Sequence, residues 1–136
     1  MGVRNRARKF LLQARYAAMM NGDPLDNNLE TLGLSARFAP PERLWIAGIA
    51  RAVTENIERI DGLIEGCLEN WRLERLNPLS RLLIEQALAE VLYTGTDAPV
   101  AIDEAVELAR EFEGDEAAGF VNAVLDRAIA SAGRPS

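Results

Sequence analysis

The segment NPLSRLLIEQALAEVLY, residues 77–93, constrains the fold more than any other part of the sequence. Ten of the fifteen residues from Leu79 to Tyr93 are apolar, and they extend almost all the way round a helix. Arg81 and Glu85 form its clearest polar edge. Asn77 followed by Pro78 marks the start, because proline is tolerated in the first turn of a helix. A helix that is apolar on nearly every side belongs in the middle of a bundle.

Helical periodicity also dominates the rest of the chain, and no stretch alternates in the manner of a strand. An arginine-rich helix is expected over residues 4–20, and a short one around 29–32, after the break at Gly22 and Pro24. From residue 46 to residue 71, apolar positions recur in steps of three and four. That stripe predicts either one long helix or two helices joined near residues 54–56, with Asn56 as the cap of the second.

Two amphipathic helices follow the break TGTDAP and complete the chain. Gly114 separates them as the expected C-terminal cap of the first, and Asp115 is placed to cap the second. The pattern predicts an all-α fold, with six or seven helices in a single compact bundle over residues 1–136. Its C-terminal helical part spans about residues 56–131.

The composition excludes several kinds of site. The chain has no histidine and a single cysteine, Cys67. No serine–histidine or cysteine–histidine nucleophile pair and no imidazole metal site can therefore form. No glycine-rich phosphate-binding motif is present either. No apolar run approaches the roughly eighteen residues of a membrane helix. We expect a cytoplasmic protein with no catalytic residue, cofactor or metal.

The charge is distributed unevenly along the chain. The formal net charge is -6, yet five basic residues and no acidic residue precede Asp23. The chain beyond Gly22 carries ten basic and twenty-one acidic residues. Cations near a helix N-terminus oppose the helix dipole by roughly 0.3–1 kcal/mol each, so stability alone does not account for them.

An arginine row on the first helix suits a nucleic acid. Arg4, Arg8 and Arg15 fall within about 40° of one another around the helix axis. Arginine presents a planar fork of donors that matches phosphate. Solvated surface charge is the simpler explanation, but we favour nucleic-acid binding. Arg6 and Lys9 flank the apolar face on its other margin, and Gln13 and Tyr16 are candidates for base contacts.

Three segments together resemble the NusB family of transcription antitermination factors. RARKFLLQARY is similar to the family's arginine-rich first helix, and NWRLERLNPLSR to its segment leading into the central helix. APVAIDEAVELAREF followed by FVNAVLDR resembles the family's paired final helices in order and separation. The resemblance runs from about Arg4 to Arg127.

The resemblance implies a protein that binds boxA-type leader RNA as a single strand. It would act with the ribosomal protein NusE in an RNA polymerase antitermination complex on ribosomal RNA operons. The family's RNA contacts come from its arginine-rich N-terminus and the start of its last helix. The matching positions here are Arg4, Arg6, Arg8, Gln13, Glu116, Phe120 and Asn122.

Several positions depart from the family's usual pattern. Asn5 interrupts the arginine run, and Gly119 stands where a basic residue can precede the Phe-Val-Asn motif. Arg15 and Glu85 stand where leucine and arginine are usual, and Ala89 replaces a tyrosine. These departures leave a second hypothesis open, a NusB-fold helical interaction module with weakened or lost RNA binding. For Phe120, core packing is the default, but we favour an exposed role in stacking on a base.

Overall fold

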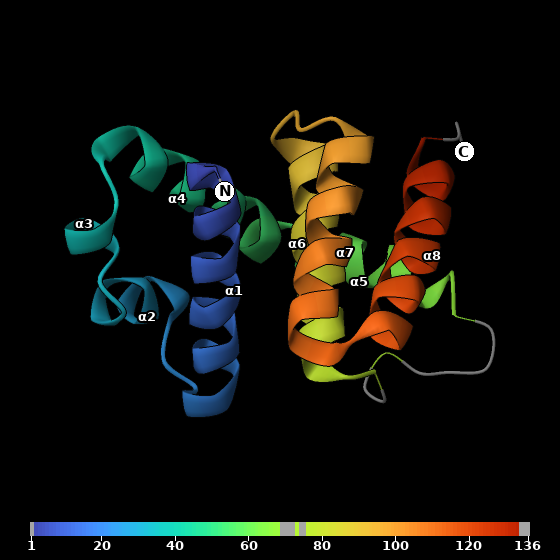
Figure 1. Cartoon of the computed structure of the whole chain (residues 1–136), viewed down its shortest axis with the longest axis horizontal. Coiled ribbons are helices and arrows are strands. Elements are labelled where there is room, and N and C mark those ends of the chain that lie inside the picture. The colour runs from blue at the N-terminus through green and yellow to red at the C-terminus, as the bar shows by residue number, and fades with distance from the viewer. Residues whose placement is uncertain (1, 69–72, 74–75, 134–136) are drawn as a thin grey trace.

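The computed structural model describes residues 2–68, 73 and 76–133 (Figure 1). In this part of the chain every regular element is a helix, as the periodicity predicted. The tryptophan-containing segment NWRLERL lies almost entirely outside the described residues. The helices are α1 (Val3–Asn21), α2 (Leu25–Thr31), α3 (Leu34–Arg37), α4 (Pro40–Glu55), α5 (Ile57–Glu65), α6 (Pro78–Tyr93), α7 (Ala98–Glu113) and α8 (Asp115–Ala132).

The described residues form eight α-helices where six or seven helices were expected for the chain. The expected short helix around residues 29–32 is α2, and the four-residue α3 follows it directly. The apolar stripe that begins at residue 46 is divided into α4 and α5, because the helix is interrupted at Asn56. Of the two arrangements that the stripe allowed, the second is correct.

Helix α6 lies at the centre of the molecule. It contacts α1 and α4 on one side and α7 and α8 on the other, and α5 also packs against it (Figure 1). Leu83, Ile84 and Leu88 are almost completely buried. Glu85 is only 3% exposed, so its expected place on a polar edge was wrong. The central position follows from the sequence, because no face of α6 is polar enough to remain in water.

The helix ends differ in how well local rules predicted them. Asn77 caps α6 as expected, since its side chain accepts a hydrogen bond from the Leu79 N–H at 2.9 Å. Gly114 ends α7 with φ at 94°, a conformation that favours glycine. Asn56 does not cap α5; its side chain donates to the Ala52 carbonyl at the end of α4. Asp115 is the first residue of α8 and accepts a hydrogen bond from Arg110 instead of capping.

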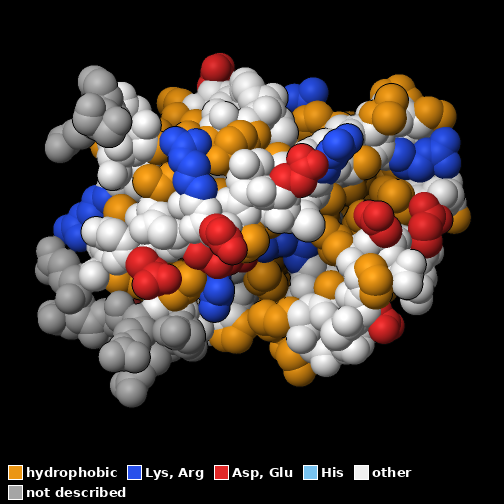
Figure 2. Space-filling view, turned by 180° about the vertical axis from the view of Figure 1, so that it is seen from behind, with side chains coloured by type: hydrophobic (Ala, Val, Ile, Leu, Met, Phe, Trp, Pro, Cys, Tyr) orange, Lys and Arg blue, Asp and Glu red, His pale blue; other side chains and the backbone are white. Residues whose placement is uncertain are grey.

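Surface charges on the far side of the molecule are mixed. Among the residues drawn in colour, basic and acidic side chains alternate with hydrophobic ones over this face (Figure 2). Within the described part of the chain, no helix is long and apolar enough to cross a membrane.

A buried ion pair fixes the upper part of α1 against α6. Arg8 Nε and Nη2 donate to the two carboxylate oxygens of Glu90 at 2.9 and 2.8 Å. Both side chains are nearly inaccessible to water. The Gln86 amide adds a hydrogen bond to the Arg8 carbonyl at 3.1 Å. A charge removed from water is tolerated only when it is paired and hydrogen-bonded, and this geometry meets both conditions.

A second buried pair joins the lower part of α1 to α6. Arg15 Nη2 donates to Glu85 Oε1 at 2.6 Å, and its Nη1 donates to the Leu82 carbonyl at 2.6 Å. Arg81 donates to the other oxygen of Glu85 and to Asp61 of α5, each at 3.2 Å. Burial would raise the pKa of Glu85, but the hydrogen bond from Asp61 and the charge of Arg15 lower it. Two arginines and two carboxyl groups therefore connect three helices.

The Asp61 carboxyl makes stability depend on pH. Burial, together with the hydrogen bond to the neighbouring Glu85 carboxylate, raises the pKa of Asp61 to about 7. The folded protein therefore retains a proton that the unfolded chain releases near its ordinary value of 3.8. This group stabilises the fold below that value, and its contribution is lost as the pH rises towards 7.

Asp61→Asn is expected to flatten the fall in melting temperature between pH 4.5 and pH 7.5. An unchanged pH profile in this variant would contradict the assignment.

Candidate nucleic-acid interface

The basic residues of α1 fall into two groups. In the first group Arg8, Lys9 and Arg15 each have a carboxylate partner, Glu90, Glu111 and Glu85 respectively. In the second group Arg4 and Arg6 are exposed, and their guanidinium groups lie over the rings of Trp45 and Phe38. Among the described residues, neither of them has an ion pair or a side-chain hydrogen bond. Arg4 and Arg6 therefore keep their hydrogen-bond donors available.

Arg8 lies in the interior, which corrects the view that the arginines only flank the core. It is 4% exposed, and Glu90 already occupies its guanidinium. Arg15, which the helical projection placed beside Arg8, is 8% exposed and paired with Glu85. Arg8 and Arg15 lie on the same face of α1, as the helical projection indicated. That face packs against Glu90 and Glu85 of α6. The sequence signal for this burial was the presence of Glu85 and Glu90 on the largely apolar helix α6, because buried carboxylates need cations as partners.

Aromatic rings hold the exposed arginines in place. The guanidinium carbon of Arg4 lies 5.0 Å from the ring centroid of Trp45 in α4. That of Arg6 lies 5.8 Å from the ring centroid of Phe38, which follows α3. A stacked guanidinium uses its face for the ring and leaves its N–H edge for a further ligand. Both rings lie outside α1, so the tertiary structure supplies this support.

The outer face of α1 carries Gln13 and Tyr16 as well. Both are exposed, Tyr16 at 38%.

Polar contacts also hold α1 against α7. The Asn5 amide donates a hydrogen bond to Glu104 at 2.9 Å, and Lys9 pairs with Glu111. Asn5, which interrupts the arginine run, thus has a structural role at the α1–α7 junction.

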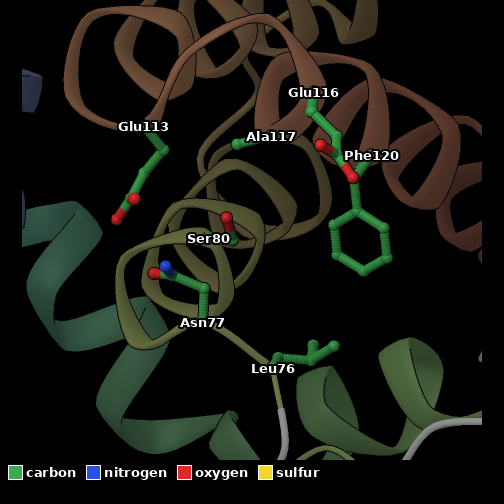
Figure 3. Close-up of a pocket in the computed structure, with 7 residues that line it drawn as sticks. All are labelled: Leu76, Asn77, Ser80, Glu113, Glu116, Ala117 and Phe120. Atoms are coloured by element: carbon green, nitrogen blue, oxygen red, sulfur yellow. The ribbon is translucent and has the colours of Figure 1, made fainter.

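The start of α8 contributes to a pocket with an acidic and aromatic lining. The cavity measures about 430 Å³ and opens between the ends of α6, α7 and α8 (Figure 3). In the close-up, Phe120 extends from α8 toward Leu76, and Asn77 and Ser80 lie on the first turn of α6 (Figure 3). The lining consists of Leu76, Asn77, Ser80, Glu113, Glu116, Ala117 and Phe120.

The pocket brings together only two of the residues that the sequence proposed for α8. Glu116 and Phe120 lie one turn apart and both line it. Asn122 is exposed but lies roughly 160° round the helix from Phe120, and it is absent from the lining. No described residue of α1 lines the cavity, so Gln13 and Tyr16 belong to a separate surface. Asn77 was interpreted only as a cap, although its position before Pro78 also places it at the mouth of this pocket.

The chemistry of the pocket suits a base better than a phosphate. Glu113 and Glu116 repel a phosphate group, but their oxygens accept hydrogen bonds from exocyclic amines. The half-buried Phe120 ring provides a stacking surface. Among the described residues, no group of three or more acidic or cysteine side chains is arranged to hold a metal ion.

Comparison with known proteins identifies the family. A model of the NusB family matches residues 5–130. The chain belongs to the NusB family. A transcription antitermination protein NusB from Anaeromyxobacter sp. strain Fw109-5 is 36% identical over 130 residues, covering 93% of this chain and 90% of that protein.

Two solved structures show the same arrangement of helices. NusB from T. maritima superimposes with a TM-score of 0.88 at 29% identity, covering 96% of this chain and 92% of that one. A structure of the antitermination factors NusB and NusE in complex with double-stranded RNA matches with a TM-score of 0.85 at 19% identity. It covers 96% of this chain and 99% of that one, and at this identity the likeness concerns the fold alone.

Proposed function

We propose that this NusB-family chain binds single-stranded, boxA-type leader RNA together with NusE. It would act in the RNA polymerase antitermination complex on ribosomal RNA operons, in the cytoplasm and without catalysis. The observation that carries the proposal is the pair Arg4 and Arg6, exposed and without a carboxylate partner among the described residues. The solved complex of the antitermination factors NusB and NusE with double-stranded RNA supports the choice of NusE and of RNA as partners.

The proposed RNA surface is smaller than the sequence suggested. Arg8 is excluded from it, because Glu90 occupies its guanidinium in the interior. Lys9 would have to exchange Glu111 for phosphate. Arg4, Arg6, Gln13 and Tyr16 remain on α1, and Glu116, Phe120 and Asn122 remain on α8.

These losses favour one alternative, a NusB-fold module that binds proteins and has weakened or lost RNA binding. The chain beyond Gly22 is strongly acidic and repels RNA at long range. A basic partner bound to that surface would reverse the repulsion. The main proposal therefore requires NusE for tight RNA binding, whereas the alternative predicts no RNA binding in either state.

The partner dependence can be measured directly. We expect weak binding of a boxA-like RNA oligonucleotide by the isolated chain, and at least about tenfold tighter binding in the presence of NusE, about 1.4 kcal/mol. Fluorescence anisotropy with boxA-like and scrambled oligonucleotides provides the comparison. In Arg4→Ala/Arg6→Ala the slope of log K against log salt should fall by about 1.4, since each single-strand phosphate contact contributes about 0.7. Equal affinities with and without NusE would contradict the proposal, and no binding in either state would favour the alternative.

Phe120 provides a second test at the pocket. Phe120→Ala is expected to cost about 1–3 kcal/mol of RNA affinity, the usual contribution of one stacked base. The loss of stability should stay below the roughly 3–5 kcal/mol of a fully buried phenylalanine. Val121→Ala is the matched control, because Val121 is fully buried beside it and does not line the pocket. It should lower the melting temperature and leave RNA affinity unchanged. A collapsed melting temperature for Phe120→Ala with unchanged RNA affinity would assign Phe120 to the core.

A further inference from the structure

Two arginines from different helices stack on one aromatic pair. Phe10 of α1 and Phe38 pack edge to face, with ring centroids 5.0 Å apart. The guanidinium of Arg6 lies 5.8 Å from the Phe38 ring. That of Arg37, the last residue of α3, lies 5.2 Å from the Phe10 ring. The aromatic pair thus carries one guanidinium group on each ring, although the two arginines are thirty-one positions apart in the chain.

Neither arginine is neutralised within the described part of the chain. Arg6 and Arg37 have no ion pair or side-chain hydrogen bond there. Other surface arginines do pair: Arg51 with Glu55, and Arg110 with Glu107. Carboxylates outnumber cations in this protein, so an unpaired arginine couple is not a consequence of composition. Each of these guanidinium groups therefore carries a charge that a bound anion could neutralise.

Stacking also prepares these groups for a ligand. Phe10 and Phe38 are 1% and 6% exposed, whereas both arginine residues are exposed. The rings restrict the guanidinium planes from beneath, so less side-chain freedom is lost when a phosphate binds. The N–H edges of the two groups remain available to solvent or to a ligand.

We propose that Arg37 forms, together with Arg6, a binding site for the phosphodiester backbone of RNA. The site extends the RNA surface from α1 onto α3 and rests on the function proposed above. Helix α3 lies on the side of α1 opposite α7 (Figure 1). The RNA strand therefore crosses α1 and continues toward α3. Phosphate contacts carry no sequence information, so Arg37 contributes to affinity for any single strand.

The competing explanation is that both arginines merely cover the aromatic rings. An aliphatic side chain of similar length performs that role equally well. Arg37→Met separates the two explanations, because it keeps contact with Phe10 and removes the charge. Arg51→Met is the matched control, since it changes the net charge by the same amount at an exposed arginine of α4.

The test is a salt titration of the full chain with NusE and a boxA-like single-stranded RNA oligonucleotide. Arg37→Met should reduce the log–log salt slope by about 0.7 and weaken binding about fivefold at 0.1 M salt. A scrambled oligonucleotide should lose the same factor, Arg37→Lys should retain most of the slope, and Arg51→Met should match the parent protein. Should Arg37→Met fail to fold, Arg37→Gln replaces it in the same titration.

The outcomes separate the two proposals. If Arg6→Met reduces the slope while Arg37→Met behaves like Arg51→Met, the site on α3 is refuted and the proposed function stands. If the parent protein binds neither oligonucleotide with NusE present, the proposed function itself fails.

Discussion

Replacing Arg8 with methionine is expected to lower the free energy of unfolding by about 3–5 kcal/mol, the cost of breaking a buried ion pair from one side. The change leaves the Glu90 carboxylate buried, with the Thr96 hydroxyl as its remaining side-chain hydrogen-bond donor among the described residues. The loss is a large part of the roughly 5–15 kcal/mol that stabilises a domain. Urea denaturation monitored by circular dichroism gives the difference directly.

Two further variants control this result. Lys9→Met removes the adjacent cation, whose ion pair with Glu111 is about 40% exposed on each side, and should cost less than about 1 kcal/mol. Arg8→Met/Glu90→Met removes both buried charges, so its stability should recover toward that of the parent protein. If Arg8→Met were as stable as Lys9→Met, the buried pair would not have the role assigned to it. The result also matters for RNA binding, because a loss of binding in an Arg8 variant would report unfolding.

Glu85→Met is expected to be comparably destabilising, by about 3–5 kcal/mol, because it leaves a buried arginine unpaired. Among the described residues, Arg15 would then retain the Leu82 carbonyl as its one hydrogen-bond acceptor. Burial lowers the pKa of Arg15 although Glu85 raises it, so the charged form would lose its main stabilising partner without Glu85. Arg15→Leu should also destabilise, because it removes one of the two arginines that pair with Glu85.

The double variant Arg15→Leu/Glu85→Met tests whether the two residues act as a pair. Its loss of stability should be clearly smaller than the sum of the two single losses, with a coupling of about 0.5–3 kcal/mol. Additive losses, measured by the same urea titrations, would show that Arg15 and Glu85 contribute independently. A coupling of this size would show that Arg15 and Glu85 act together as one ion pair.

The sequence by itself determined the helices and most of their ends. Periodicity identified α1, α6, α7 and α8, and the apolar circumference of α6 placed it at the centre, because these properties depend on residues close together in the chain. Asn77 and Gly114 were predicted as helix ends for the same reason. Asn56 and Asp115 were not predicted correctly, since an asparagine or aspartate can bond to either neighbouring helix or to a distant side chain.

Only the tertiary structure decided which charges are buried. The four arginines of α1 are chemically alike: Arg4, Arg6, Arg8 and Arg15. A helical projection shows on which side of the helix each one lies, but not which group of another helix it contacts. Glu85 and Glu90 of α6 lie seventy and eighty-two residues away from their partners. Folding brings them against Arg15 and Arg8, whereas Arg4 and Arg6 meet aromatic rings and remain at the surface. The pocket at Phe120 and the arginine pair on Phe10 and Phe38 have the same origin. Each is built by side chains from separate helices, and no local pattern specifies which helices pack together.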